Sequence, residues 1–326
     1  MNITIIMINH NGSSLLKNSL ANFKVSLEKS WETHQNFEFI FVDNDSIDDS
    51  VAIVNTHLRN VKFPWRIIYE KMLGVNFARN AGIKASKGDY LIFTDNDLRF
   101  SEDWLNAFYL AFSDYPKYQV FAGRVLVGDL ECTPPDWLAT SGHFCIPAIV
   151  VQCDHGENPS IFTLRDAGPV GPNMAFHRSI FEQWGLFDTR FGLRPGSLVP
   201  AAEAEYFDRL ASGHVSCVYV PNAIVFHPIR AQQMTKRYFL KRVYGIGRAS
   251  ARINRIRKTP CKRFFGITLY KFEHLVFSVF RYLSALFKTE PQERFFLFSR
   301  IFLHLGYIYE DWQYFHTDCH PIPDGK

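Results

Sequence analysis

Two aspartates stand at the end of one of the most apolar segments of the chain. The stretch GDYLIFTDNDLRF, residues 88–100, passes from apolar residues to Asp95, Asn96 and Asp97. If the backbone is extended there, both carboxylates leave it on the same side and could bind one hard divalent cation. The alternative is a turn in which these side chains bond their own backbone. The motif alone favours the turn, whereas an acidic cluster at the end of a buried strand favours a cation.

The segments around these aspartates alternate between two periodicities. Short apolar or β-branched runs, typical of strands, occupy residues 3–8, 37–43, 65–70 and 89–95. Between them, apolar residues recur at helical spacing in residues 13–32, 46–58 and 75–86. Strands and helices in alternation predict an α/β fold with a mostly parallel central sheet, which binds its ligands at the carboxyl ends of the strands.

Polar residues follow three of the predicted strands, at positions 9–11, 43–45 and 95–97. The carboxyl ends of parallel strands meet at one edge of a sheet. We therefore expect these three groups to converge on one crevice.

The middle of the chain, residues 118–228, is less regular and richer in Gly and Pro. In the stretch DAGPVGPNMAFHRSIFEQWGLFD, its pattern predicts a loop that leads to a short helix. It then predicts a second helix bearing Glu203 and Glu205, and a final strand ending at His227. Beyond this strand the pattern becomes helical and basic.

Positive charge is concentrated in the C-terminal third. The formal net charge of the chain is +4, but residues 228–300 contain 17 Lys or Arg and three Asp or Glu. We expect one domain over residues 1–227 and a basic, aromatic-rich helical region over residues 228–326. Such helices suit an anionic membrane surface, with a buried helical subdomain as the alternative. Nucleic acid is not expected, because no recognised binding module accompanies the charge.

The cysteines and the N-terminus bear on location. Six cysteines without a Cys-x-x-Cys pair indicate neither a disulfide framework nor a thiolate zinc site. The N-terminus MNITIIMINHNG has no pattern of a secretory signal, and no apolar run reaches the roughly 18–20 residues of a membrane span. We expect a reducing, cytoplasmic location.

Six motifs run in order along residues 1–227. They are ITIIMINHN, FIFVDNDSIDDS, GVNFARNAGIKASKGDYLIFTDND, GPNMAFHRSIFEQWGLFD, AAEAEYFDRL and YVPNAIVFH. In order and spacing they resemble the inverting family-2 glycosyltransferases of the GT-A fold. The resemblance implies an enzyme that takes a sugar from a nucleotide-sugar and inverts its anomeric configuration. It also implies a Mn²⁺ or Mg²⁺ ion that neutralises the leaving diphosphate.

The resemblance assigns five residues to the donor nucleotide. Asp43 matches the acidic residue that contacts the nucleobase, and the loop from Asn9 to Asn11 helps to frame it. Arg79 and Asn80 match a motif in which a helix carries polar groups toward the nucleotide. From pattern alone, Asp43 could equally be a helix cap, and the other pair a solvated helix face.

The cation site follows from the same resemblance. Asp95 and Asp97 match the Asp-x-Asp motif, in which the second carboxylate binds the cation and the first lies near the ribose and the metal. His227 matches a histidine that completes the metal site in many relatives. A structural histidine after an apolar strand is the alternative.

The candidate base departs from the pattern of the family. Relatives usually read Gly-Glu-Asp-x-Glu, whereas residues 201–205 read Ala-Ala-Glu-Ala-Glu. We expect Glu203 to replace the catalytic aspartate, with Glu205 as a supporting or substitute carboxylate; solvated helix residues are the alternative. Asn173 matches an element that lines the acceptor side.

The resemblance also suggests a biological role. It implies transfer of one sugar, with a UDP-sugar favoured, to a glycan or lipid-linked acceptor in bacterial cell-surface polysaccharide assembly, peripheral at the inner face of the membrane. Two other functions stay open. A degenerate glycan-binding or scaffold protein would explain the altered Gly-Glu-Asp motif. A nucleotidyltransferase would typically carry a Gly-rich basic phosphate loop after the first strand, which NHNGSS lacks.

Overall fold

The chain divides into two compact units. The structure, a computed structural model, describes residues 1–138, 149–164, 168–194, 199–200, 202–286 and 289–317. Unit 1 comprises residues 1–133, 150–195 and 202–230, and unit 2 comprises residues 134–149, 196–201 and 231–326.

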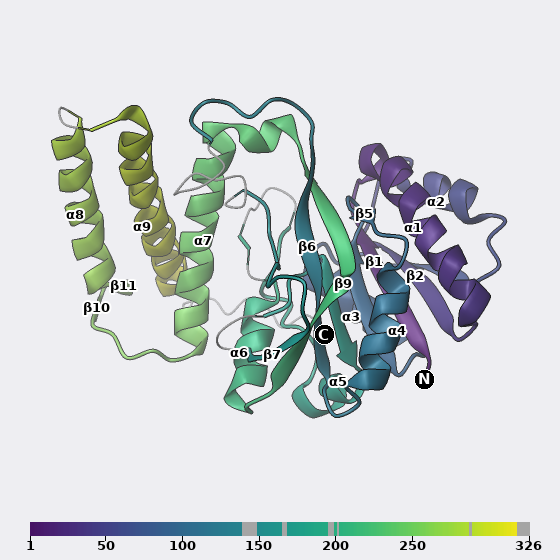
Figure 1. Ribbon diagram of the computed structural model, residues 1–326. Helices are drawn as coiled ribbons and strands as arrows, with labels where there is room; N and C mark the ends of the chain where they lie inside the picture. The colour runs from purple at the N-terminus through teal and green to yellow at the C-terminus, as the bar shows by residue number, and fades with distance from the viewer. Residues whose placement is uncertain (139–148, 165–167, 195–198, 201, 287–288, 318–326) are drawn as a thin grey trace. The chain divides into compact units, whose positions relative to one another are not determined.

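Unit 1 is built on one mixed sheet with helices on either side (Figure 1). The strands are β1 (Ile3–Asn9), β2 (Phe37–Asp43), β3 (Trp65–Tyr69), β4 (Tyr90–Asp95), β5 (Arg99–Phe100), β6 (Val120–Leu130), β7 (Ser160–Thr163), β8 (Asn173–His177) and β9 (Ser216–Ile229). Their order is β3-β2-β1-β4-β8-β6-β9-β5, with β7 paired to β9. The first four of these neighbours are parallel, and β8 is antiparallel to both β4 and β6. The predicted α/β architecture is confirmed.

The helices of unit 1 cover the sheet. They are α1 (Ser13–Thr33), α2 (Ser50–Leu58), α3 (Val75–Ala85), α4 (Trp104–Asp114), α5 (Ser179–Trp184) and α6 (Ala204–Ser212). Helix α3 packs on β1 and β2, whereas α1 and α4 pack on each other and on β5 and β9. Strand β4 is buried along its length up to Thr94. A strand covered on both faces reads as a continuous apolar run, which is why this segment stood out in the sequence.

Long-range pairing changes the middle of unit 1 from what the pattern predicts. Asn173–His177 forms strand β8, where the sequence predicted a loop, because the segment pairs with β4 on one side and β6 on the other. Helix α6 begins at Ala204, so Glu203 precedes it. Strand β9 continues past His227 to Ile229. Five residues of strand carry too little periodicity to reveal partners so distant in sequence.

Asn173 joins three elements inside the core. Its side chain is completely buried. Oδ1 accepts a hydrogen bond from Nε1 of Trp104 at 2.9 Å, and Nδ2 donates to the carbonyl oxygens of Arg124 at 3.0 Å and Ala223 at 2.7 Å. A Cβ atom at Gly123 would lie 2.2 Å from this amide, so β6 requires a glycine there. The Asn173 side chain thus has a packing role.

Unit 2 is mainly helical. Its elements are the 3-10 helix η2 (Ala231–Met234), α7 (Lys236–Ile256), the hairpin of β10 (Arg263–Phe264) and β11 (Ile267–Thr268), α8 (Leu269–Ala285) and α9 (Pro291–Thr317). Helix α9 packs against both α7 and α8 (Figure 1). The predicted C-terminal helical region is confirmed. Among the described residues, no helix has the length and apolar character that a membrane span requires.

Two glycines let α7 and α9 approach closely. A Cβ atom at Gly247 of α7 would lie 2.0 Å from the carbonyl oxygen of Leu303, and one at Gly306 of α9 would lie 2.1 Å from that of Tyr244. Contacts this short are not available to any other residue type, so both glycines are needed for the packing of these helices.

Several arginines of α7 are paired within unit 2. Arg248 and Arg252 both reach the carboxylate of Glu310, at 2.6 Å and 2.5 Å, and Arg255 lies 3.1 Å from that of Asp311. Both acidic side chains are buried, and a buried carboxylate is stable only when it is neutralised. These three arginines, which the sequence pattern offered to an anionic partner, therefore neutralise α9.

Replacing Asn173 tests the packing role of its amide. Asn173→Ala removes three hydrogen bonds and leaves the Trp104 N–H without its acceptor, so we expect the free energy of unfolding to fall by about 2–4 kcal/mol. Urea denaturation measures this change. Asn222→Ala, at an exposed asparagine of β9, should stay within about 0.5 kcal/mol of wild type. Equal stabilities for the two variants would contradict the packing role.

Candidate active site

The polar ends of three parallel strands meet as expected. In the sheet register, Asn9 lies opposite Asp43, and Ile8 lies opposite Asp95. Asn9 donates from Nδ2 to Asp43 Oδ1 at 3.4 Å, and its Oδ1 accepts a hydrogen bond from Asn96. The side chain of Asn9 thus joins the end of β1 to the end of β2 and to the turn after β4.

The loops that follow β1 and β2 are bonded to each other. Ser46 Oγ accepts hydrogen bonds from Asn9 Nδ2 and from the backbone N–H of Asn11, both at 3.0 Å. Asn11 Oδ1 accepts from the backbone N–H of Ile47 at 2.9 Å. Asn11 itself has a φ of 49°, in the left-handed region that asparagine tolerates better than most residues. The two loops are therefore tied to each other beside the strand ends, and we call them the loop wall.

Asp48 adds a contact that sequence reasoning missed. Its Oδ2 accepts from the backbone N–H of Ser13 at 2.9 Å, at the start of α1, and Oδ1 accepts from the backbone N–H of Ser50 at 3.0 Å. Burial alone would raise its pKa, but hydrogen bonds from Ser50 and Ser13 outweigh burial and lower the pKa of Asp48 to about 2. An ionised Asp48, which lies in the loop before α2, therefore caps the start of α1.

Asp43 is buried within this wall. Its Oδ2 accepts from the backbone N–H of Ser46 at 3.2 Å, which closes a turn after β2. The residue that precedes α2 is Asp49, so the helix-cap alternative for Asp43 does not hold. Asp43 and Asn9 are each 3% exposed. Both buried side chains bond Ser46 and so hold the loop after β2 in its conformation.

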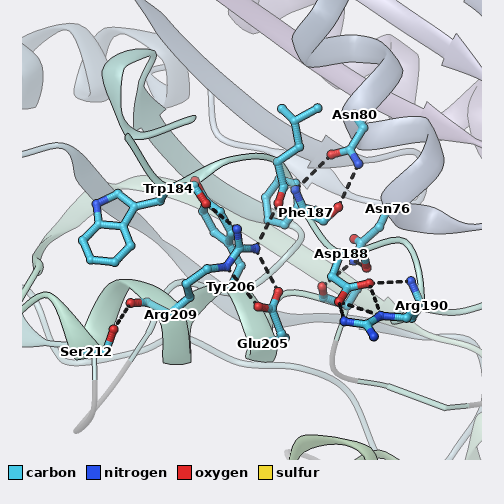
Figure 2. A network of polar contacts seen from close by, with 12 residues as sticks. Asn76, Asn80, Trp184, Phe187, Asp188, Arg190, Glu205, Tyr206, Arg209 and Ser212 are labelled. Carbon is cyan, nitrogen blue, oxygen red and sulfur yellow. Dashed lines mark hydrogen bonds and ion pairs between the residues drawn. The ribbon is translucent and has the colours of Figure 1, made fainter. Parts of the chain in front are cut away.

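Helix α3 supplies an arginine and two asparagines with different tasks. Asn76 Nδ2 donates to the carbonyl oxygens of Asp188 at 2.9 Å and Ala202 at 2.6 Å. Asn80 donates to the carbonyl of Phe187 at 2.8 Å and accepts from its N–H at 3.1 Å (Figure 2). Both amides hold the segment after α5, and both polar atoms of the Asn80 amide are engaged with the backbone of Phe187.

Arg79 is the group of α3 that reaches the acidic residues. Its Nη1 lies 3.4 Å from Glu203 Oε2, and its side chain is 4% exposed. The guanidinium also lies over the ring of Phe187, 5.6 Å from the centroid. A Cβ atom at Gly171 would lie 2.3 Å from Arg79 Nη2, so Gly171 makes room for this arginine.

Glu203 is held at the start of α6. Its Oε1 accepts from the backbone N–H of Gly171 at 3.1 Å, while Oε2 faces Arg79. The side chain is 22% exposed. A carboxylate offers about four lone-pair directions, so two hydrogen bonds leave Glu203 able to accept a proton.

Glu205 lies in a separate ion pair. Its carboxylate receives Nε and Nη2 of Arg209, at 3.0 Å and 2.9 Å, in a bidentate pair one helical turn away. Arg209 also donates to the carbonyl oxygens of Trp184, the last residue of α5, and of Leu186, two residues beyond it (Figure 2). Glu205 therefore orients the arginine that caps α5, and the structure does not bring it to Glu203.

Asp95 and Asp97 form the acidic part of this group of strand ends. Asp95 is the last residue of β4, and Asp97 follows in a turn, so the strand and turn expectations each hold for one of them. Burial raises the pKa of Asp95 to about 6, and the Asp97 carboxylate acts in the same direction. Arg79 and His227 oppose this rise, while Glu203 adds to it. The five side chains thus share one electrostatic environment.

Arg230 was not singled out from the sequence. Its Nη2 lies 3.2 Å from Asp97 Oδ2, across 133 residues of chain. The signal available in the sequence was its place three residues after His227, at the end of the same strand. Nothing in the local pattern identifies the carboxylate that it meets.

His227 has one ring nitrogen engaged. Its Nδ1 lies 3.0 Å from the carbonyl oxygen of Pro228, which can only accept. A neutral ring therefore carries its proton on Nδ1 and leaves a lone pair on Nε2, the form that binds metals. Within the described segments, however, no three His, Cys, Asp or Glu side chains are grouped closely enough to hold a metal ion.

The donor set still fits a divalent cation in its chemistry. Two carboxylates at one strand end provide the hard oxygen ligands that Mg²⁺ and Mn²⁺ prefer. Burial, and then the neighbouring Asp97 carboxylate, raise the pKa of Asp95, although Arg230 lies against Asp97. A cation would supply positive charge beside the pair.

Matched relatives include several glycosyltransferases. A glucosyl-dolichyl phosphate glucuronosyltransferase of Haloferax volcanii is 25% identical over 173 residues, which is 52% of this chain and 48% of that protein. An uncharacterized glycosyltransferase of Haemophilus influenzae is 32% identical over 74 residues, 23% of this chain and 30% of that protein. The chain thus spans about half the length of the first relative and less of the second.

Two solved structures share the fold. The mannosyltransferase PcManGT from Pyrobaculum calidifontis, in complex with GDP-Man and Mn²⁺, matches with a TM-score of 0.51 and 14% identity over 100% of this chain and 76% of that one. S. aureus TarS 1–349, in complex with UDP, matches with a TM-score of 0.51 and 15% identity over 100% and 95%. At these identities the match shows the GT-A fold alone. The family model described as "Glycosyl transferase family 2" matches residues 4–185, more than half of the 326 residues, and the chain therefore belongs to glycosyl transferase family 2.

Proposed function

We propose that this glycosyltransferase moves a sugar from a nucleotide-sugar, with a UDP-sugar favoured, to an acceptor hydroxyl with inversion at the anomeric carbon. The observation that carries the proposal is the shared environment of Asp95, Asp97, Arg79, Glu203 and His227 at the carboxyl ends of the parallel strands. This is the edge at which α/β sheets bind nucleotides.

We assign the nucleotide to the loop wall made by the loops after β1 and β2. The buried Asn9 and Asp43 would shape this wall, and exposed backbone groups around Asn11 and Asp45 would face the base. UDP in TarS and GDP-Man in PcManGT show what those two proteins bind. The preference for a UDP-sugar is our proposal for this chain.

Asp95 and Asp97 would hold a Mn²⁺ or Mg²⁺ ion, and His227 would join them through Nε2 only after its side chain moves closer than it lies in this structure. When bound, the ion would neutralise the diphosphate as it leaves. Arg230 would turn from Asp97 toward the phosphates, because the ion then neutralises the carboxylate in its place. The two carboxylates thus orient the donor.

Glu203 is our candidate for the general base. The acceptor oxygen forms a bond to the anomeric carbon while the bond from that carbon to the diphosphate oxygen breaks, and the hydroxyl proton passes to Glu203. Inversion follows because attack and departure occur on opposite faces of the sugar. A general base of this kind contributes roughly 10²–10⁴ to the rate.

Arg79 positions this base. Together with the Gly171 N–H, it fixes both carboxylate oxygens of Glu203, so the longer side chain keeps one orientation where relatives carry an aspartate. Burial of the guanidinium strengthens its hold. This pair of contacts is a specific reason to prefer Glu203 to Glu205, whose carboxylate is committed to Arg209.

The acceptor is proposed to be a glycan or a lipid-linked sugar, in cell-surface polysaccharide assembly. The Haloferax relative is named as a glucosyl-dolichyl phosphate glucuronosyltransferase, which supports a lipid-linked acceptor by analogy. Asn173, expected on the acceptor side, would contact an acceptor only by giving up one of its three internal hydrogen bonds.

A thermal-shift screen tests donor and cation together. UDP-, GDP- and dTDP-sugars are compared with and without Mn²⁺, and we expect the UDP-sugar with Mn²⁺ to raise the melting temperature most, because binding to the folded state alone stabilises it. Asp97→Asn should lose most of this rise. Asp114→Asn, at an exposed aspartate of α4, should keep it. A rise that is equal with and without Mn²⁺ would contradict the cation proposal.

The role of Glu203 is tested by Glu203→Gln, which keeps the size of the side chain and removes its basicity. We expect kcat for release of the nucleoside diphosphate in the presence of acceptor to fall by roughly 10²–10⁴, with donor affinity unchanged. Calorimetric titration gives the affinity. Glu182→Gln, at an exposed glutamate, is the matched control. Wild-type turnover in Glu203→Gln would sink the assignment, and an inactive wild type would favour the degenerate-scaffold alternative.

Glu205→Gln separates a structural glutamate from a substitute base. Because the change weakens the bidentate contact with Arg209, we expect the free energy of unfolding to fall by about 1–2 kcal/mol while kcat stays near that of wild type. Chemical denaturation and steady-state kinetics give the two quantities. Loss of kcat without loss of stability would make Glu205 the catalytic carboxylate.

A further inference from the structure

Helix α8 exposes an apolar face. Only Ala285 of its 17 residues is buried. The side toward α9 contacts that helix through Tyr282, whose ring lies 5.2 Å from that of Phe298. Facing away from α9 is a stripe that we call the outer α8 surface, spaced at intervals of three or four residues and made of Leu269, Phe272, Val276, Phe280 and Leu283.

The exposure of this surface is large for aromatic side chains. Phe272 is 55% exposed and Phe280 is 64% exposed. Isolated apolar residues on a protein surface need no explanation, but a contiguous stripe along a helix marks an interaction site.

A second pair of rings precedes the helix. Phe264 and Phe265, at the tip of the β10–β11 hairpin, are 65% and 66% exposed, and their centroids lie 4.5 Å apart. Phe265 and Gly266 have positive φ values of 46° and 75°, which close the tight turn. Two exposed phenylalanine rings at a hairpin tip could enter an apolar layer.

Two charged side chains hold the backbone of the hairpin by hydrogen bonds. Arg255 donates to the carbonyl oxygen of Gly266 at 3.0 Å, and Asp311 accepts from the backbone N–H of Thr268 at 2.9 Å. These two side chains also pair with each other. The rings therefore stay exposed because the backbone beneath them is held in place.

The charge beside the hairpin is positive, whereas α8 itself carries the basic residues Lys271 and Arg281 and one exposed acidic residue, Glu273. Residues 257–272 contain five Lys or Arg and no Asp or Glu. Lys258, Lys262 and Arg263 are exposed beside the hairpin. In contrast, Arg248 and Arg252 of α7 are paired with Glu310. Exposed positive charge therefore lies next to the phenylalanines.

We propose that the outer α8 surface and the Phe264–Phe265 tip insert into the interfacial region of an anionic lipid bilayer. Lys258, Lys262 and Arg263 then meet the headgroups. A bilayer offers an apolar layer bounded by negative charge, which matches an apolar face flanked by cations, whereas the apolar face of a second copy would bring cations against cations. This surface goes beyond the proposed function, since lipid binding does not require catalysis.

The exposed phenylalanines also determine how binding to an anionic bilayer should depend on salt. A basic helix held by charge alone would release at high salt. The exposed phenylalanines add a contribution that salt does not screen, so binding should weaken at high salt without being abolished.

Vesicle sedimentation with the full chain tests the proposal. Wild type should bind vesicles of phosphatidylcholine and phosphatidylglycerol more tightly than vesicles of phosphatidylcholine alone. Phe272→Ser/Phe280→Ser should weaken binding to the anionic vesicles by roughly tenfold or more, since two large apolar side chains no longer enter the bilayer. Lys262→Glu/Arg263→Glu should remove the preference for anionic vesicles.

The control applies the same kind of change elsewhere. Val25→Ser/Leu110→Ser removes two exposed apolar side chains of unit 1 and should leave vesicle binding unchanged. Circular dichroism verifies that each variant is folded. The proposal is overturned if wild type ignores anionic vesicles, or if Phe272→Ser/Phe280→Ser binds them as wild type does. It is also overturned if that variant instead turns a wild-type dimer into a monomer in light scattering, which would identify a second copy as the occupant.

Discussion

Negative charge held at the ends of buried strands is the constraint on which the candidate site depends. Asp95 closes a strand that is buried up to Thr94, and its pKa is raised to about 6 by burial and by Asp97. Two arginines reduce this cost, one at 3.2 Å from Asp97 and one at 3.4 Å from Glu203. Carboxylates that need positive charge in the resting protein are suited to recruiting a cation, because the same charge deficit favours its binding.

Buried amides keep these charged groups in place. Asn76 and Asn80 of α3 hold the segment after α5, and Asn173 joins β8 to β6, β9 and Trp104. Such amides make directional hydrogen bonds but carry no net charge, so they do not add to the repulsion among the carboxylates. Near the strand ends, the amides therefore support the segments that carry Asp95, Asp97 and Glu203 without adding charge of their own.

How far the sequence predicts this arrangement depends on the distance between partners. Strand ends at Asn9, Asp43 and Asp95 were predictable, since alternating strands and helices place them on one edge. The partners of Arg79 and Arg230 lie 124 and 133 residues away, and periodicity carries no information about such pairs. Strand β8 was missed for the same reason. The burial of Asn80 and Asn173, which matched donor and acceptor motifs, could not be predicted from the sequence because burial of a side chain is a tertiary property.

The same reasoning applies to charge in unit 2. A count along the sequence assigns all the arginines of α7 to a surface, but Glu310 and Asp311 are buried in α9 and require three of them. What attracts a partner is the charge left without an internal counterpart, and beside the hairpin that charge accompanies exposed rings. Pairing inside the unit and exposure at its surface are therefore linked: the Arg255–Asp311 pair that neutralises α9 also holds the backbone of the hairpin, and so sets where the apolar and basic groups are displayed.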